Sequence, residues 1–193
     1  MSVDRAVFEF IYSLNGNALF DQTFLFMAEY LVFLIPLSIL FLWFQDRRGK
    51  EDALFTTSST VAGIMVSYLM GVFYMHENPS AVYDTLVSFH PENSFPSQHT
   101  ASMVAATFPL LKKGRKKLGW LMTVSALLTG FSRIYIGEHW PVDILGSLFA
   151  AFLGFAIVCF SWERVETVWR SGLDLYENVE EKLFSHSLEI KER

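Results

Sequence analysis

Long apolar runs alternate with short polar segments along the chain, and most of the runs are long enough to cross a lipid bilayer. A membrane-spanning helix needs about 20 predominantly apolar residues. The expected spans are residues 23–44, 53–75, 98–111, 118–134 and 141–162. The pattern predicts an all-α fold: an integral membrane bundle of five to six helices, forming a single domain over residues 1–193 with its core at 23–162.

The run 98–111 is the shortest of the five and reaches only about 21 Å as a helix, at 1.5 Å per residue. One of its ends should therefore begin below the membrane surface. We assign that end to His99, because Lys112 and Lys113 can extend their charged groups to the interface at the other end.

Both ends of the chain carry apolar residues at helical spacing. In residues 2–14 the apolar stripe consists of Val3, Val7, Phe10, Ile11 and Leu14. The stripe predicts an amphipathic helix that lies on the membrane, and a helix packed on the bundle fits it equally well. Residues 163–185 show a similar pattern, which predicts a C-terminal amphipathic helix at a surface or against a partner protein.

Composition and charge narrow the class of protein further. Of the 193 residues, 52% are hydrophobic and 19 are phenylalanine, as in helical membrane proteins. The net charge is -5, and the basic clusters are short and lie between apolar runs, which argues against nucleic acid binding. The single cysteine, Cys159, excludes an intrachain disulfide and a cysteine metal site.

The basic residues predict how the chain is oriented in the membrane. They gather in two loops, at 45–52 and at 112–117. Because positively charged loops favour the cytoplasmic side, both loops are expected there. The N-terminus is then outside, the C-terminus is cytoplasmic, and the polar segments around His99 and Arg133 both lie on the outer face.

These two polar segments contain the candidate catalytic and anion-binding residues. Ser97, Gln98 and His99 stand at the start of an apolar helical run, where exposed N–H groups and the helix dipole favour an anion. In the second segment, residues 132–143, an arginine offers a planar fork suited to a phosphate. A histidine and an aspartate follow at four-residue spacing, so the carboxylate can orient the imidazole.

Together the two segments resemble the type 2 phosphatidic acid phosphatase superfamily, which includes the vanadium haloperoxidases. The last family motif reads Ser-Arg, five residues, His, three residues, Asp, and it is matched here by Ser132, Arg133, His139 and Asp143. The middle motif, Pro-Ser-Gly-His, is matched by residues 96–99 with Gln98 in the glycine position. The sequence around both motifs, over about residues 70–147, is most similar to the bacterial undecaprenyl-diphosphate phosphatase branch of this superfamily.

The resemblance implies a role for each matched residue. His139 would be the nucleophile that forms a phosphohistidine, Asp143 would orient it, and His99 would protonate the leaving oxygen. The phosphate oxygens would be held by the side chains of Arg133 and Ser97 and by the backbone N–H of Gln98. This scheme implies no metal and no cofactor.

The first family motif, a lysine followed after six residues by Arg-Pro, is altered in this chain. Gly71 stands in the lysine position and Asn78 in the arginine position, and no lysine or arginine occurs from Glu51 to Leu111. Asn78 can still donate a hydrogen bond to phosphate. Three other residues are candidates to replace the missing charge: Arg5, His76 and His90.

The resulting hypothesis is a metal-independent membrane phosphatase that cleaves a polyprenyl diphosphate to the monophosphate at the outer membrane face. Its partners would be the lipid phosphate and the membrane, and it would serve carrier-lipid recycling for cell-wall assembly. Two alternatives stay open. One is a phosphatase for phosphatidic acid or phosphatidylglycerol phosphate, and the other is a non-catalytic membrane protein that binds a lipid phosphate or acts as a small carrier.

Overall fold

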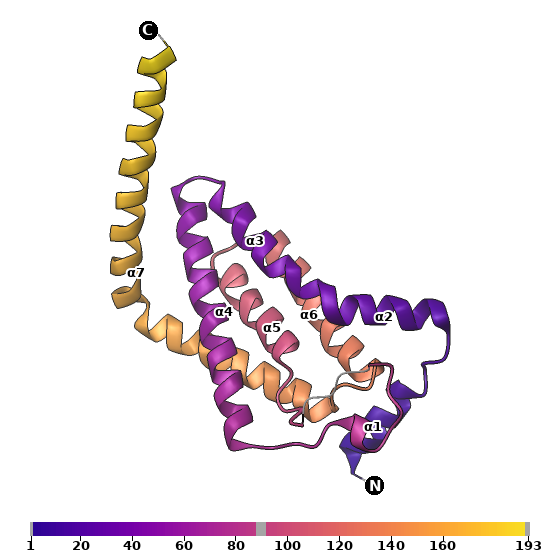
Figure 1. The fold of residues 1–193 in the computed structure, drawn as a ribbon. Coiled ribbons are helices and arrows are strands. Elements are labelled where there is room, and N and C mark those ends of the chain that lie inside the picture. Colours follow the sequence, from indigo (N-terminus) through magenta and orange to yellow (C-terminus); the bar gives the residue numbers. More distant parts are fainter. Residues whose placement is uncertain (1, 88–91, 192–193) are drawn as a thin grey trace. The chain divides into compact units, whose positions relative to one another are not determined.

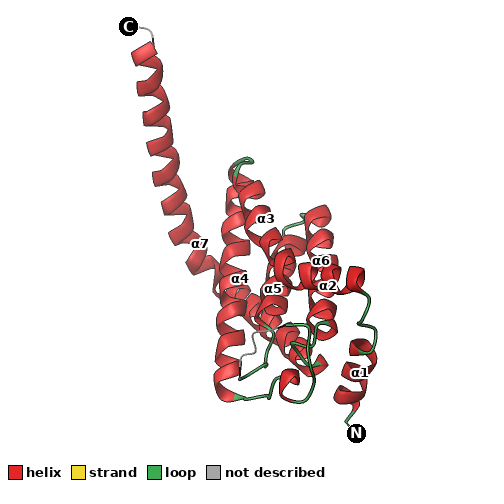
Figure 2. Ribbon diagram, turned by 45° about the vertical axis from the view of Figure 1, so that its right-hand side comes forward, coloured by secondary structure: helices red, strands yellow, loops and turns green. Residues whose placement is uncertain are grey.

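The computed structural model describes residues 2–87 and 92–191, with side chains as far as Lys182, and its elements are helices (Figures 1 and 2). In chain order they are α1 Val3–Tyr12, α2 Ala18–Tyr30, the 3-10 turn η1 Leu31–Phe33, α3 Leu34–Trp43, α4 Arg47–Phe73, the 3-10 turn η2 Pro79–Ala81, α5 Gln98–Lys112, α6 Lys116–Tyr135 and α7 Pro141–Lys191. They form two compact units, Met1–Val158 and Cys159–Arg193. The all-α prediction is confirmed, and the single domain expected over residues 1–193 stays a prediction.

Helix α5 lies in the centre of the first unit, packed between α4 and α6 (Figure 1). Most of its side chains are buried, and Met103, Ala105 and Leu110 are fully so. Helices α2 and α3 pack on α6 and α4 respectively. Three stretches of the described chain are long and apolar enough to cross a membrane: Ala18–Trp43, Arg47–Phe73 and Pro141–Lys182.

Local capping explains where the helices depart from the expected bounds. The first span begins at Ala18 instead of residue 23, because the Asn17 side chain accepts hydrogen bonds from two N–H groups of the first turn. The expected loop 45–52 was wrong from residue 47 onward, because these residues are already helical. There the Asp46 carboxylate accepts from the Gly49 N–H, 2.9 Å away, and starts α4 at Arg47.

Two further differences concern the interruption and the end of helices. The turn η1 tightens the helix just before Pro36, whose missing N–H leaves the Val32 carbonyl without its usual partner one turn away. At the other end of the chain, α7 continues past residue 162 to Lys191 as one helix, instead of stopping before a separate C-terminal helix.

Helix α1 packs on the rest of the first unit with Phe8 as its buried residue, and it leaves most of its apolar stripe exposed. The Phe8 side chain is fully buried against the rings of Tyr12, Tyr83 and Trp140. Val3 and Phe10, by contrast, are 81% and 69% exposed. The helix therefore packs on the bundle, as one of the two alternatives proposed, and it presents its predicted apolar stripe outward.

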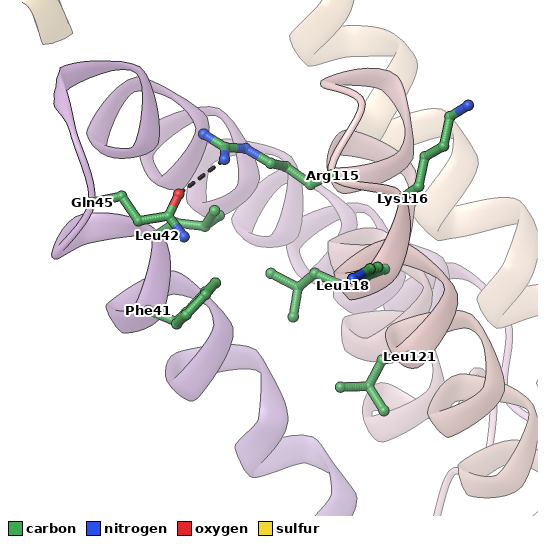
Figure 3. A pocket seen from close by; sticks show the side chains of 8 residues that line it. Phe41, Leu42, Gln45, Arg115, Lys116, Leu118 and Leu121 are labelled. Carbon is green, nitrogen blue, oxygen red and sulfur yellow. Dashed lines mark hydrogen bonds between the residues drawn. The ribbon is translucent and has the colours of Figure 1, made fainter.

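The two basic loops meet at one end of the first unit. The Arg115 Nε donates to the buried Asp52 carboxylate at 2.7 Å, and its Nη1 donates to the Gln45 side chain at 2.9 Å. Figure 3 shows the bond between Arg115 and Gln45 beside an apolar cavity of about 440 Å³. The wall of this cavity includes Phe41 and Leu118. The loops that carry the candidate site residues lie at the opposite ends of α5 and α6, near α1 (Figure 1).

Candidate active site

The end of α6 places Arg133 and His139 close together. Gly137 adopts φ +81°, which a residue with a side chain rarely adopts, and it turns the chain back on the last helical turn. The backbone N–H groups of Glu138 and His139 then both donate to the Arg133 carbonyl, at 3.1 and 3.2 Å. His139 is therefore held beside the residue that precedes it by six positions.

Four of the seven predicted site residues line one cavity of about 550 Å³: Gln98, His99, Arg133 and His139. Gln98 and His99 come from the first turn of α5, and Arg133 comes from the last turn of α6. Arg133 and His139 are 4% and 5% exposed, so the cavity reaches into the protein. The helical hairpin of α5 and α6 thus brings the two polar segments together.

Asp143 lies behind His139 but binds other groups more closely. The distance from its Oδ2 to His139 Nδ1 is 3.5 Å, which allows an ion pair but is long for a hydrogen bond. The same Oδ2 accepts from the Trp140 N–H at 2.9 Å, and Oδ1 lies 2.7 Å from the Nδ1 of His76. Because the carboxylate is fully buried and accepts hydrogen bonds, His76 Nδ1 is assigned as a donor.

His76 was expected as a possible replacement for the missing phosphate-binding cations. It bonds to Asp143 instead, and the described lining of the cavity does not include it. Sequence reasoning missed this contact, because nothing in the local pattern links a loop histidine to a carboxylate 67 positions later. His90, the other expected substitute, lies outside the described residues.

The guanidinium of Arg133 is held by two carboxylates. Its Nη2 donates to Glu138 Oε1 at 2.6 Å and its Nη1 to Glu29 Oε1 at 3.3 Å. Glu138 lines the cavity and is 9% exposed, whereas the Glu29 side chain on α2 is half exposed. Glu29 on α2 is therefore a partner of the predicted phosphate ligand.

Two predicted phosphate ligands make bonds within the protein. The fully buried Ser97 hydroxyl accepts from the Thr100 hydroxyl at 3.1 Å. Asn78 caps η2 by accepting from the Ser80 N–H, and its amide nitrogen donates to the Glu138 carbonyl at 3.0 Å. Asn78 thereby fixes the loop that carries Glu138. Phosphate binding by Ser97 and Asn78 stays a prediction.

Gly71, in the position of the missing lysine, lies where the backbone of another segment approaches closely. A Cβ atom there would lie 2.9 Å from the Phe95 carbonyl oxygen. The Gly71 carbonyl accepts from the side chain of Asn93 at 2.7 Å, and Asn93 Oδ1 in turn accepts from the His76 and Phe95 N–H groups. Asn93, which sequence reasoning did not single out, therefore joins the three segments around the cavity.

Helix α1 supports the loop after His139 and holds Arg5 away from the cavity lining. Its Asp4 carboxylate accepts from the Val142 N–H at 2.8 Å, at the start of α7. Arg5, considered as a substitute cation, bonds to Glu9 and to the Tyr83 hydroxyl, each at 3.0 Å. The hydrogen bonds from Tyr83 and Arg5 lower the pKa of the Glu9 carboxyl.

Comparison with known proteins places the chain in a family. The PAP2 superfamily matches residues 72–168, which include the candidate site. This chain belongs to the PAP2 superfamily. The family resemblance predicted from the two polar motifs is thereby confirmed.

Several known proteins are similar to this chain over most of its length. Undecaprenyl-diphosphatase BcrC of Bacillus subtilis is 32% identical over 183 residues, covering 93% of this chain and 92% of the relative. Bacitracin transport permease protein BcrC of Bacillus licheniformis is 26% identical, covering 91% and 88%. The structure of a transmembrane PAP2-type phosphatidylglycerolphosphate phosphatase from Bacillus subtilis has a TM-score of 0.64 at 21% identity, covering 84% of this chain and 85% of that chain, and shows the common fold. With its apolar helices, this PAP2 protein is a membrane protein.

Proposed function

We propose that this PAP2 protein is a lipid phosphatase that hydrolyses an undecaprenyl-type polyprenyl diphosphate to the monophosphate. The observation that carries the proposal is the convergence of His99, Arg133 and His139 on one cavity, with Asp143 buried behind them. The similarity to an undecaprenyl-diphosphatase over nearly the whole chain supports the choice of a polyprenyl diphosphate.

In the proposed first step, His139 attacks the terminal phosphorus. Its Nδ1 faces Asp143, so Nε2 is the nitrogen available to form the P–N bond. The bond from phosphorus to the bridging oxygen breaks, and His99 gives its proton to that oxygen as the lipid monophosphate leaves. The positive charge on the phosphorylated imidazole is stabilised by the Asp143 carboxylate, itself held by His76 and the Trp140 N–H.

In the second step, water attacks the phosphohistidine. His99, now unprotonated, takes a proton from the water, and the P–N bond breaks to release phosphate and restore His139. Phosphoryl transfer requires mainly positioning and charge neutralisation. Arg133 supplies a cation and the first turn of α5 supplies N–H groups, in the arrangement that favours anions at a helix N-terminus.

Catalysis at the outer face of the cell membrane is part of the proposal. The two basic loops lie together, with Arg115 reaching Asp52 and Gln45, and the candidate site lies at the other ends of α5 and α6. If the basic end is cytoplasmic, as positively charged loops favour, the cavity opens on the extracytoplasmic side. The N-terminus would then lie outside and the C-terminus inside.

Phosphate release by the purified protein in detergent tests the proposal, with polyprenyl diphosphate, phosphatidic acid and phosphatidylglycerol phosphate compared in the presence of a chelator. We expect the diphosphate to be the best substrate and His139→Ala to release no phosphate above background. Release that disappears with the chelator would refute metal independence. A folded protein that releases no phosphate from any of the three lipids would favour the non-catalytic alternative, which the altered Gly71 and Asn78 positions suggest.

A further inference from the structure

The shortest ion pair in the candidate site uses the Arg133 guanidinium, which the proposed function assigns to the substrate phosphate. Among the described residues that line the cavity, Arg133 is the only arginine or lysine. Its Nη2 already donates to Glu138 at 2.6 Å, slightly shorter than the about 2.7–2.9 Å usual for a charge-assisted N–H···O bond. A phosphate that binds the same guanidinium edge must therefore compete with the Glu138 carboxylate.

Glu138 is held in place by bonds from two directions. Its N–H donates to the Arg133 carbonyl, and its carbonyl accepts from the Asn78 amide. The side chain is 12% exposed, against 50% for Glu29. Glu29 can turn outward when a phosphate enters, whereas Glu138 stays beside Arg133.

The surroundings of the second carboxylate oxygen of Glu138 indicate how phosphate binding would affect the negative charge of this side chain. Oε2 is buried and has no hydrogen-bond partner within the described structure, and the same is true of Arg133 Nε. If phosphate takes the guanidinium, Glu138 becomes a buried anion without a counterion and next to a second anion. Desolvation and like-charge repulsion both favour binding of a proton by such a group.

We propose that Glu138 competes with phosphate for Arg133 and takes up a proton from water when phosphate binds. The protonated carboxyl then donates a hydrogen bond to a phosphate oxygen, which compensates in part for the missing lysine and arginine of the first motif. The inference rests on the proposed function, because it assumes that phosphate binds at Arg133.

Other charged groups near Glu138 contribute their own pH dependence. They are Glu29 on α2, His99 on α5, Arg133 on α6, Asp143 on α7, and Glu92 and His139 on the connecting segments. The experiment must therefore separate the Glu138 proton from those of the histidines, which a comparison of wild type with a Glu138 variant achieves.

Tungstate is a suitable probe, because it is a tetrahedral dianion that carries no proton near neutral pH. Its binding to the full-length protein in detergent would be measured by calorimetry in two buffers of different ionisation enthalpy, which counts the protons taken up. For wild type we expect uptake of about one proton more than for Glu138→Gln. At pH 8 we expect Glu138→Gln to bind tungstate roughly tenfold more tightly, since one competing charge is gone.

Glu92→Gln is the matched control, because Glu92 also lines the cavity but is exposed. We expect its affinity for tungstate to change by less than about threefold, as for an exposed charge. Glu138→Ala serves as a second variant: it also removes the competing charge, so tighter binding is expected, but by less than for glutamine because no amide donor replaces the carboxyl.

Equal or weaker binding of tungstate by both Glu138 variants, with thermal unfolding unchanged, would overturn the proposal and leave the phosphatase function intact. Equal proton uptake by wild type and Glu138→Gln would overturn it as well. If Arg133→Gln bound tungstate as well as wild type, the proposed phosphate site itself would fall, and this inference with it.

Discussion

Replacing His76 by alanine tests how strongly catalysis depends on the support of Asp143. The change removes a donor 2.7 Å from a carboxylate that is fully buried. A hydrogen bond to a charged group contributes about 1.5–3 kcal/mol, and about 1.4 kcal/mol corresponds to a factor of ten in rate. In the proposed mechanism Asp143 stabilises the charge that develops on His139, so we expect kcat to fall by about 10- to 100-fold.

The same variant should leave substrate binding almost unchanged. The described cavity lining does not include His76, and its backbone bonds to Asn93 and Ser94 do not need the imidazole. We therefore expect KM for the lipid diphosphate within about twofold of wild type, since no contact to the substrate is lost. Steady-state phosphate release over a range of substrate concentrations measures both constants.

Asparagine at position 76 separates a positioning role from a merely structural one. Its amide nitrogen can occupy the place of Nδ1 and donate to Asp143, so His76→Asn should recover most of the lost kcat. Glu77→Gln, an exposed change in the same loop, is the matched control and should behave as wild type. Full activity of His76→Ala, or equal loss in the alanine and asparagine variants, would refute the reasoning.

Two further predictions concern packing. Phe8→Ala removes a fully buried ring, a change that costs about 3–5 kcal/mol in a core. The amides of α1 should therefore exchange hydrogen faster, and kcat should fall because Trp140 loses its contact with the Phe8 ring. Unchanged hydrogen exchange in α1 would contradict this prediction. Gly154→Val should lower the midpoint of thermal unfolding, because a Cβ there would clash with the Gly63 backbone, and overpacking costs about 1–3 kcal/mol or more. Gly172→Val, where an added Cβ would meet only its own helix within 4 Å, is the control, and an equal shift in both variants would refute the contact.

The helices could be predicted because a bilayer restricts the chain strongly. Long apolar runs have to be helical in lipid, so the pattern alone indicates where α2 to α4 and α6 lie. The starts of α2 and α4 were missed, because a single capping side chain, Asn17 or Asp46, decides them. Hydropathy is insensitive to such caps, since they lie outside the apolar run.

The residues of the candidate site that match family motifs could be predicted from the sequence. The contacts that support these residues could not. His99, Arg133 and His139 stand in motifs, so their meeting in one cavity follows from the hairpin of α5 and α6. The ion pair between Arg133 and Glu29 joins residues that are 104 positions apart in the sequence. Local periodicity cannot predict a contact between residues so far apart along the chain. The bond from His76 is of the same kind, and only the folded chain reveals it.

Trapping the covalent intermediate tests the central claim most directly. The purified protein would be mixed with polyprenyl diphosphate labelled in its terminal phosphate, quenched within milliseconds in alkali, and mapped by mass spectrometry. Our account predicts a label that is stable in alkali, lost in acid, and attached to His139, and no label in His139→Ala. A protein that releases phosphate without labelled His139, or that carries the label on another residue, would contradict the proposed mechanism.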